Sequence, residues 1–223
     1  MTATASREEL LVTLASRVLA LPDDAPRAVC LTGVGCSGKT TLAADLDDVV
    51  RGAGRSVVPV AYDDFHFARD RRHRQGRTSD AGYLDDSFDP AALRRLVLDP
   101  VAAGATSIVP AAYDLADERP LDAEPVPLPP DGVVLVEGSF LLVPDLADRW
   151  DLAVMVVAEP GGVLERGLVR DADLGPPEQV RELYLRRYLA AEALHQERDD
   201  PWTRADVVVD MSDPDRPTVL GSR

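Results

Sequence analysis

The chain has 223 residues, of which 45% are hydrophobic and 28% are charged, and these values are typical of one α/β domain with a full hydrophobic core. Its formal net charge of −15 argues against a general nucleic-acid binder, because phosphate backbones require a cationic surface. The two cysteines, Cys30 and Cys36, provide neither a disulfide framework nor the spacing of metal ligands.

The N-terminal residues 1–24 predict an amphipathic helix. Five apolar residues recur there at helical spacing: Leu10, Leu11, Leu14, Val18 and Leu21. Acidic residues, Glu8 and Glu9, precede them, whereas a signal peptide starts with basic residues. No apolar run approaches the roughly 20 residues that span a bilayer. We therefore expect a cytoplasmic protein without membrane contact.

Strand and helix signals alternate along the rest of the chain, which predicts a parallel sheet covered by helices on both faces. Five segments are predicted as its strands: 27–32, 56–61, 133–138, 152–157 and 205–209. Four segments between them are predicted as helices: 40–51, 90–103, 161–171 and 177–198. Residues 107–110 predict a small added strand, and the proline-rich residues 120–130 predict a surface loop.

Between the first strand and the next helix lies a complete phosphate-loop pattern, G-x-x-x-x-G-K-[ST]. Its glycines permit a tight loop whose N–H groups converge on a phosphate at the positive end of the helix. Lys39 supplies a cation for the β- and γ-oxygens, and the Thr40 hydroxyl is a Mg²⁺ ligand. The pattern predicts that ATP–Mg²⁺ is bound by Gly33, Gly35, Cys36, Ser37, Gly38, Lys39, Thr40 and Thr41.

Other nucleotide-binding classes fit less well. The glycines also satisfy the dinucleotide pattern G-x-G-x-x-G, but Lys39-Thr40 is the ending of a phosphate loop. A GTPase would carry Asn-Lys-x-Asp, which is absent from the chain. Motor and transporter ATPases would be expected to have an acidic pair after the strand that here ends in Glu137-Gly138.

A set of further motifs follows the phosphate loop in a fixed order. Asp63 and Asp64 come directly after the second strand, whose carboxyl end should face the ligand crevice. The motifs are Asp63-Asp64-Phe65-His66, Asp86-Ser87-Phe88-Asp89, Pro110-Ala111-Ala112-Tyr113-Asp114, Val136-Glu137-Gly138, Arg166 with Arg170-Asp171, and the stretch 188–206. With the phosphate loop, this ordered set resembles the uridine kinase and phosphoribulokinase family, with some likeness to bacterial pantothenate kinases, over residues 27–213.

The resemblance implies an α/β P-loop NTPase fold. Its central parallel sheet would have five strands with helices on both faces, and a small lid and acceptor-binding insertion would be added to it. Residues 1–223 would form a single kinase domain. Within it, 1–24 would be the N-terminal helix, 62–130 the acceptor-side insertion, and 166–199 the lid and C-terminal helices.

The resemblance also implies that the γ-phosphate of ATP is transferred to a hydroxyl of a small metabolite. Asp63 would orient or deprotonate that hydroxyl and could touch Mg²⁺, although Asp64 is an open alternative. Glu137 would complete the Mg²⁺ ligands with Thr40. Together with Lys39, Arg166 and Arg170 would clamp the transferring phosphate, because residues four apart share one helix face. The acceptor would be bound by Asp64, His66, Asp86, Tyr113 and Arg119.

Uridine or cytidine is the leading acceptor, with pantothenate or a sugar as alternatives. The sequence departs from uridine kinases at Gly82-Tyr83-Leu84-Asp85, which lacks the family's His and Pro for nucleoside recognition, and the lid segment 171–177 is short. A non-catalytic ATP-binding regulatory protein is the competing class. Whether GTP replaces ATP and whether the chain forms a homo-oligomer stay open. A basic cluster could recruit an anionic acceptor or be a solvated loop: Arg69, Arg71, Arg72, His73, Arg74 and Arg77.

Overall fold

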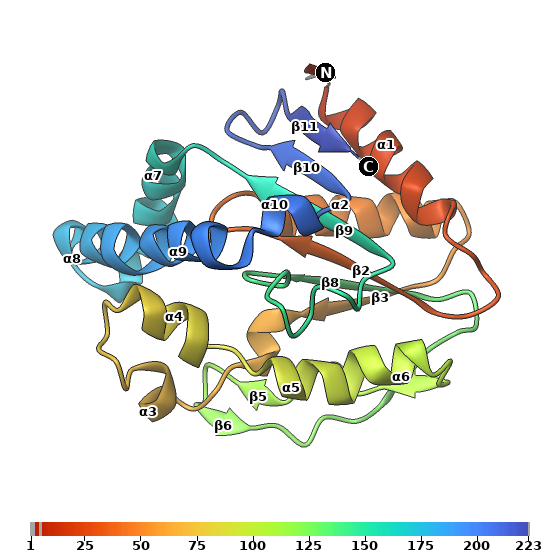
Figure 1. Cartoon of the computed structure of the whole chain (residues 1–223), viewed down its shortest axis with the longest axis horizontal. Coiled ribbons are helices and arrows are strands. Elements are labelled where there is room, and N and C mark those ends of the chain that lie inside the picture. The colour runs from red at the N-terminus through yellow and green to blue at the C-terminus, as the bar shows by residue number, and fades with distance from the viewer. Residues whose placement is uncertain (1–2, 5, 223) are drawn as a thin grey trace.

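The computed structural model describes residues 3–4 and 6–222, and it shows a twisted central sheet with helices on both faces (Figure 1). Five neighbouring strands are parallel, in the order β3 (Val57–Ala61), β8 (Val133–Gly138), β2 (Arg27–Thr32), β9 (Leu152–Val157) and β10 (Val207–Asp210). The predicted P-loop NTPase architecture is therefore confirmed.

The predicted count of five strands is wrong, because the sheet continues past β10 to seven strands. Strand β11 (Thr218–Ser222) returns antiparallel to β10, and the two-residue β1 (Ala3–Thr4) pairs with β11. The C-terminal segment that forms β11 has no long apolar run, since an antiparallel strand near the edge of a sheet need not be buried on both faces.

One face of the sheet is covered by α1 (Arg7–Leu19) and α2 (Lys39–Gly52). Successive strand residues point to opposite faces, so that Val29 and Leu31 of β2 pack under these two helices. A capping box formed by Ser6 and Glu9 begins α1. The helix lies within the segment that the apolar spacing predicts as helical.

The opposite face is covered by a helical segment with an internal π turn and by the residues that follow β8. The segment comprises α5 (Pro90–Leu93), the π turn Arg94–Leu98 and α6 (Asp99–Ala102), where one continuous helix was predicted. The short helix α10 (Pro201–Arg204) leads from the C-terminal helices back to β10.

Two further groups of elements lie at the carboxyl edge of the parallel strands. The first comprises α3 (Arg69–Arg72), α4 (Asp80–Asp86) and the pair β5 (Tyr113–Asp114) with β6 (Arg119–Pro120), whereas the other small pair, β4 (Ser107–Ile108) with β7 (Val126–Pro127), lies beside α6. The second comprises α7 (Pro160–Arg170), α8 (Pro177–Leu183), the π turn Tyr184–Tyr188 and α9 (Leu189–Asp199). The proline-rich segment 120–130 thus contributes short strands as well as loop.

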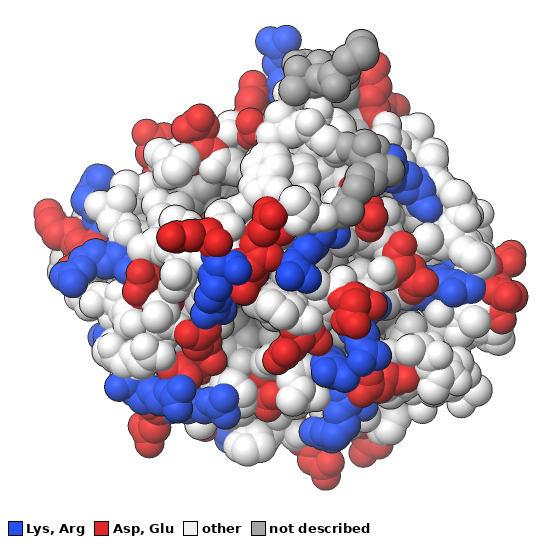
Figure 2. Space-filling view, viewed as in Figure 1, with Lys and Arg blue, Asp and Glu red and all other residues white. Residues whose placement is uncertain are grey.

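Charged side chains of both signs are interspersed on the face shown in Figure 2. Within the described part of the chain, no helix combines the length and the apolar character that crossing a membrane requires.

Candidate active site

The order of the strands fixes where a ligand can bind. The first parallel strand along the chain, β2, lies between β8 and β9, whereas the strand that follows it, β3, lies beyond β8. Such a reversal of strand order opens a crevice at the carboxyl ends of the strands. The phosphate loop follows β2, Glu137 ends β8, and Asp63 follows β3. The three motifs therefore meet at one edge of the sheet.

The loop depends on glycine at two positions. A Cβ on Gly33 would lie 2.2 Å from the backbone oxygen of Val156, so that no larger residue fits without movement of β9. Gly38 has a φ of 97° and caps the N-terminus of α2, a conformation that glycine adopts without strain. The Ser139 hydroxyl donates to the Gly33 oxygen at 3.1 Å and anchors the loop to the end of β8. These contacts hold the loop at the start of α2.

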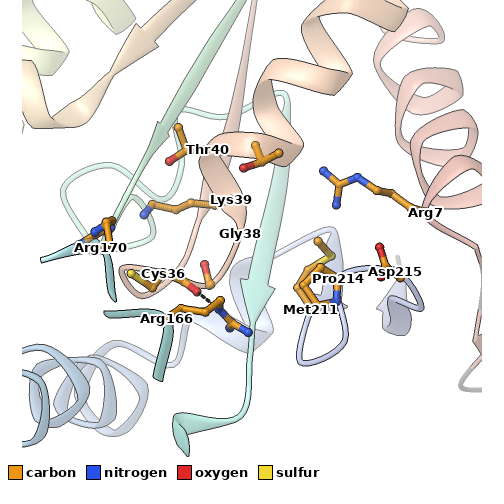
Figure 3. A pocket seen from close by; sticks show the side chains of 12 residues that line it. Arg7, Cys36, Gly38, Lys39, Thr40, Arg166, Arg170, Met211, Pro214 and Asp215 are labelled. Carbon is orange, nitrogen blue, oxygen red and sulfur yellow. Dashed lines mark hydrogen bonds between the residues drawn. The ribbon is translucent and has the colours of Figure 1, made fainter. Parts of the chain in front are cut away.

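A cavity of about 610 Å³ opens along this loop. It is lined by Arg7, Cys36, Ser37, Gly38, Lys39, Thr40, Thr41, Arg166, Arg170, Met211, Pro214 and Asp215. Figure 3 shows Lys39 and Arg170 on one side of it and Arg7, which reaches in from α1, on the other. Lys39 is 9% exposed and is the only lysine of the chain. All predicted nucleotide-binding residues from Cys36 to Thr41 line this cavity.

Two oxygen ligands suited to Mg²⁺ meet beside Lys39. The Thr40 hydroxyl donates to Oε2 of Glu137 at 3.0 Å. Burial raises the pKa of Glu137; Asp63 and Asp64 add to this effect, which Lys39 and Thr40 oppose. No cluster of three or more His, Cys, Asp or Glu in the described residues could hold a metal by itself. The pair fits Mg²⁺ bound with a nucleotide, because such Mg²⁺ takes one or two protein oxygens with phosphates and water.

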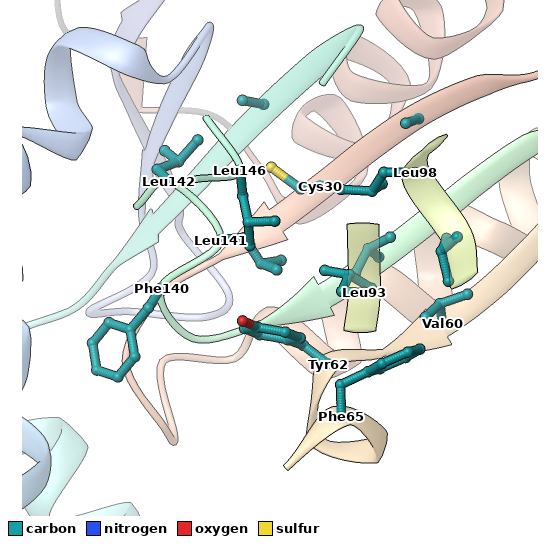
Figure 4. Packing of buried hydrophobic residues seen from close by; sticks show 14 of the residues in the cluster. Cys30, Val60, Tyr62, Phe65, Leu93, Leu98, Phe140, Leu141, Leu142 and Leu146 are labelled. Atoms are coloured by element: carbon teal, nitrogen blue, oxygen red, sulfur yellow. The ribbon is translucent and has the colours of Figure 1, made fainter. Parts of the chain in front are cut away.

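Asp63 and Asp64 lie on a tight 3-10 turn, Tyr62–Phe65, whose outer residues are buried. Figure 4 shows Tyr62 and Phe65 directed into the core, and the Tyr62 ring stacks on Phe88 at 4.7 Å. This anchoring leaves Asp63 exposed at the crevice, while Asp64 is half-buried. Burial, and then the charges of Asp63 and Asp114, raise the pKa of Asp64.

A second cavity of about 320 Å³ lies on the Asp63 side of the loop. It is lined by Gly35, Asp63, His66, Arg72, His73, Tyr83, Ser87, Leu115, Arg170, Asp171, Leu174, Arg187 and Tyr188. The structure thus brings together four residues to which the sequence analysis assigned a role in the site, namely Gly35, Asp63, His66 and Arg170. Arg170 lines both cavities and marks their junction.

The two predicted clamp arginines both lie on α7 but have different hydrogen-bond partners. Nε of Arg166 donates to the Cys36 oxygen at 2.8 Å, which ties α7 to the phosphate loop. Arg170 donates to both carboxylate oxygens of Asp171, at 2.7 and 2.9 Å, and to the Tyr184 hydroxyl at 3.1 Å. Burial raises the pKa of Asp171, but the hydrogen bonds from Arg170 and Tyr184 outweigh it and lower the pKa.

Besides Asp64, three predicted acceptor-binding residues do not line the second cavity. Asp86, the last residue of α4, is fully buried, and Arg74 and Gln75 donate to its Oδ2 at 2.8 and 2.7 Å. The Tyr113 hydroxyl donates to Glu118 at 3.0 Å. Arg119 is exposed beside the carboxylates of Asp114 and Asp117. Each of these side chains is engaged by neighbours in its own segment.

Residues that the motifs did not assign a role complete the second cavity. They are Arg72, His73, Tyr83, Asp171, Arg187 and Tyr188. The sequence named Arg72 and His73 in the basic cluster, Asp171 beside Arg170 and Tyr188 in the stretch 188–206, but it did not single out Arg187. Arg187 lies in a charged helical segment, where an arginine ordinarily indicates a solvated face.

No protein-family model matches the chain, and no curated protein matches it. Solved structures do. A possible uridine kinase from Bacillus stearothermophilus aligns with a TM-score of 0.71 at 23% identity, over 90% of this chain and 97% of that one. A candidate fructose transport system kinase from Silicibacter sp. aligns with a TM-score of 0.68 at 22% identity, over 85% and 94% of the two chains.

D-glycerate 3-kinase from Cryptococcus neoformans var. grubii aligns over 96% of this chain and 98% of its own, with a TM-score of 0.61 at 13% identity. At such identities the similarity establishes the fold, and it agrees with the resemblance that the ordered motifs indicate. The chain has the fold of the uridine kinase-like P-loop kinases.

Proposed function

We propose that the protein is an ATP- and Mg²⁺-dependent phosphotransferase that moves the γ-phosphate to a hydroxyl group of a small metabolite. One observation carries the proposal: Arg170 lines both the cavity along the phosphate loop and the cavity that contains Asp63. A γ-phosphate held by Lys39 would lie near that junction, opposite a hydroxyl held at Asp63. The non-catalytic alternative gives no role to a second cavity with a carboxylate.

Each residue has a part that phosphoryl transfer needs, since this chemistry is mainly positioning and neutralisation of charge. The loop amides and Lys39 would bind the β- and γ-phosphates, and Thr40 with Glu137 would hold Mg²⁺. When bound, Mg²⁺ would neutralise phosphate oxygens. Asp63 would orient the acceptor hydroxyl and take up its proton.

In the proposed reaction the acceptor oxygen forms a bond to the γ-phosphorus, and the bond from that phosphorus to the β,γ-bridging oxygen breaks. The products are a phosphate monoester and ADP. Residues 62–130 would supply the acceptor side and residues 166–199 the lid. Uridine or cytidine is the acceptor that the motif resemblance favours, with pantothenate- and sugar-type acceptors as alternatives.

The single lysine makes nucleotide binding directly measurable. An amine-directed acylating reagent can modify only Lys39 and the α-amino group of an unblocked chain. We expect ATP with Mg²⁺ to protect Lys39 but not the α-amino group, as read by peptide mass. Labelling of Lys39 that is unchanged by ATP would contradict the proposal.

Transfer itself is tested with a panel of hydroxyl acceptors, by following ADP release and detecting the phosphorylated product. Lys39→Ala should lower transfer by about 10²- to 10³-fold, because a donor aimed at the developing charge is lost. ATP binding with no product from any acceptor would favour the regulatory alternative.

A further inference from the structure

Arg187 is a buried cation at the wall of the second cavity. It is 5% exposed and lies on the π turn between α8 and α9. Its guanidinium donates to neutral oxygens only: Arg77 O at 3.2 Å, Ser79 O at 3.4 Å, Arg72 O at 3.5 Å and Ser87 Oγ at 3.2 Å. It forms no ion pair with any residue that the structure describes.

A second arginine, Arg72, lines this cavity with Arg187. Arg72 pairs with Glu118 through one terminal nitrogen, but its buried Nε has no hydrogen-bond partner. Burial lowers the pKa of His73, and the charges of Arg187, Arg72, Arg69 and Arg77 lower it further. Of the two carboxylates that line the cavity, Asp171 is already held by Arg170. Because Glu118 pairs with Arg72, Arg187 is the one arginine among the described lining residues without a carboxylate partner, and Asp63 is the one lining carboxylate without an arginine partner.

Burial of a guanidinium without a carboxylate partner has a desolvation cost, which neutral oxygens and the Tyr83 ring, centred 4.9 Å from the guanidinium carbon of Arg187, offset only in part. The cost is recovered when an anion enters, because the planar guanidinium matches the two oxygens of a carboxylate or phosphate. Burial also lowers the pKa of Arg187, which is the response of a cation without a counter-charge. π turns of this kind are frequent at functional sites.

We propose that the acceptor carries, besides the hydroxyl that is phosphorylated, a carboxylate or phosphate group that binds Arg187 and Arg72. The inference rests on the proposed phosphotransferase function and narrows its acceptor to small anionic alcohols, so that a neutral nucleoside is not the preferred substrate. The cavity volume of about 320 Å³ is at the lower end for ligand pockets, which agrees with a small acid or sugar phosphate.

The test compares acceptors that differ in charge but share a hydroxyl-bearing carbon skeleton. Glycerol, glycerate and glycerol 3-phosphate form one set, and panthenol with pantothenate forms another. We expect an anionic member to exceed its neutral partner in kcat/KM by about 30-fold or more, as for other buried charge contacts. The more efficient of the carboxylate and phosphate members identifies the anionic group. Calorimetric titration of the same compounds, with Mg²⁺ and a non-hydrolysable ATP analogue, measures acceptor binding without turnover.

Two variants and a matched control locate the effect at Arg187. Arg187→Gln should raise KM for the anionic acceptor about 30-fold while KM for ATP changes by less than about twofold. Arg187→Lys keeps the charge and should retain part of the preference for the anion. Arg186→Gln makes the same charge change one residue away, at a side chain that is 67% exposed and paired with Glu182, and should have no effect.

Arg187 also holds carbonyl groups of the segment before α4, so that loss of its packing could weaken acceptor binding in general. A purely structural role would lower the efficiency of neutral and anionic acceptors alike, whereas the proposed role removes the preference between them. If Arg187→Gln does not fold, the anion site is tested by the ratio of kcat/KM for anionic and neutral acceptors in the wild type and in Arg187→Lys.

The outcomes separate the two proposals. Equal use and equal binding of neutral and anionic partners would overturn the anion site and leave the phosphotransferase standing. Binding of an anion that depends on Arg187, with no transfer to any acceptor, would support the anion site and overturn the phosphotransferase. Absence of both binding and transfer for every anion would overturn the anion site.

Discussion

The hydroxyl of Thr40 donates a 3.0 Å hydrogen bond to Oε2 of Glu137 and so joins the start of α2 to the end of β8. Two elements that are far apart in the sequence thereby present adjacent oxygen ligands before any nucleotide is bound. The backbone supports this contact, because β2 pairs in parallel register with β8 up to Thr32 and Gly138. A preformed pair of ligands lowers the cost of ordering a metal site.

Replacement of Glu137 by glutamine should weaken Mg²⁺ binding with little change of shape. The amide oxygen can still accept from Thr40, but the negative charge is lost. At fixed Mg²⁺ we expect transfer to fall by about 10- to 100-fold and to recover in part as Mg²⁺ is raised. The Mg²⁺ dependence of the rate measures the effect, and Glu8→Gln on the exposed side of α1 is the charge-matched control. A Glu137→Gln enzyme with the wild-type Mg²⁺ dependence would remove Glu137 from the metal site.

Asp63 and Asp64 can be separated by their different positions on the 3-10 turn. Asp63 lines the second cavity, whereas Asp64 is half-buried and does not line it. Asp63→Asn should lower kcat by about 10²- to 10⁴-fold with ATP binding retained, as expected for loss of a general base. Asp64→Asn should lower kcat less. The reverse order, measured in parallel at saturating ATP, would move the acceptor-side role to Asp64.

The parallel strands could be predicted almost to the residue, because strands buried on both faces are continuous apolar runs. Strands β2, β8 and β9 begin and end where those runs do. The phosphate loop could be predicted for a related reason, since its ligands are consecutive residues. The antiparallel strand β11 and the π turns could not be predicted, because neither leaves a periodic signal in the sequence.

The second cavity was harder to predict, because its residues come from segments between Gly35 and Tyr188 that only the fold brings together. Asp86 shows that a sequence motif does not reveal burial. The motif predicts that Asp86 binds the acceptor, but in the structure its carboxylate is buried and accepts hydrogen bonds from Arg74 and Gln75. Arg187 is the opposite case, a residue that no motif singles out but that lines the cavity. It lies on the π turn between α8 and α9, which the sequence does not distinguish from a regular helix.

Gly167 on α7 should be intolerant of any side chain. A Cβ there would lie 2.1 Å from the ring of Tyr184, whose hydroxyl contacts Cys36 and Asp171. Gly167→Ala must displace the ring, and we expect a loss of about 1–3 kcal/mol in the free energy of unfolding together with weaker ATP binding. Gly161→Ala, on the same helix with no atom within 4 Å of its Cβ, should be neutral or stabilising. Equal stability of the two variants in chemical denaturation would mean that α7 and Tyr184 do not pack in this way.

Asp86 should stabilise the fold in a pH-dependent manner. Burial raises the pKa of Asp86, but hydrogen bonds from Gln75 and Arg74 outweigh it and lower the pKa below its usual value of 3.8. A carboxyl whose folded-state pKa is lowered contributes stability that is fully present above the unfolded-state pKa and is lost as the pH falls through the folded-state pKa.

Asp86→Asn should therefore lower the free energy of unfolding by about 2 kcal/mol at neutral pH, the scale of hydrogen bonds to a charged group. The difference from the wild type should shrink as the pH falls below 3.8 and through the lowered folded-state pKa, where protonation removes the charge from the wild-type carboxyl as well. Urea denaturation at several pH values measures both effects, with Asp122→Asn at an exposed site as the control. A deficit that stayed constant over this range would show that the variant loses packing and not an ionic interaction with Arg74, whose own side chain is 61% exposed and free to return to solvent.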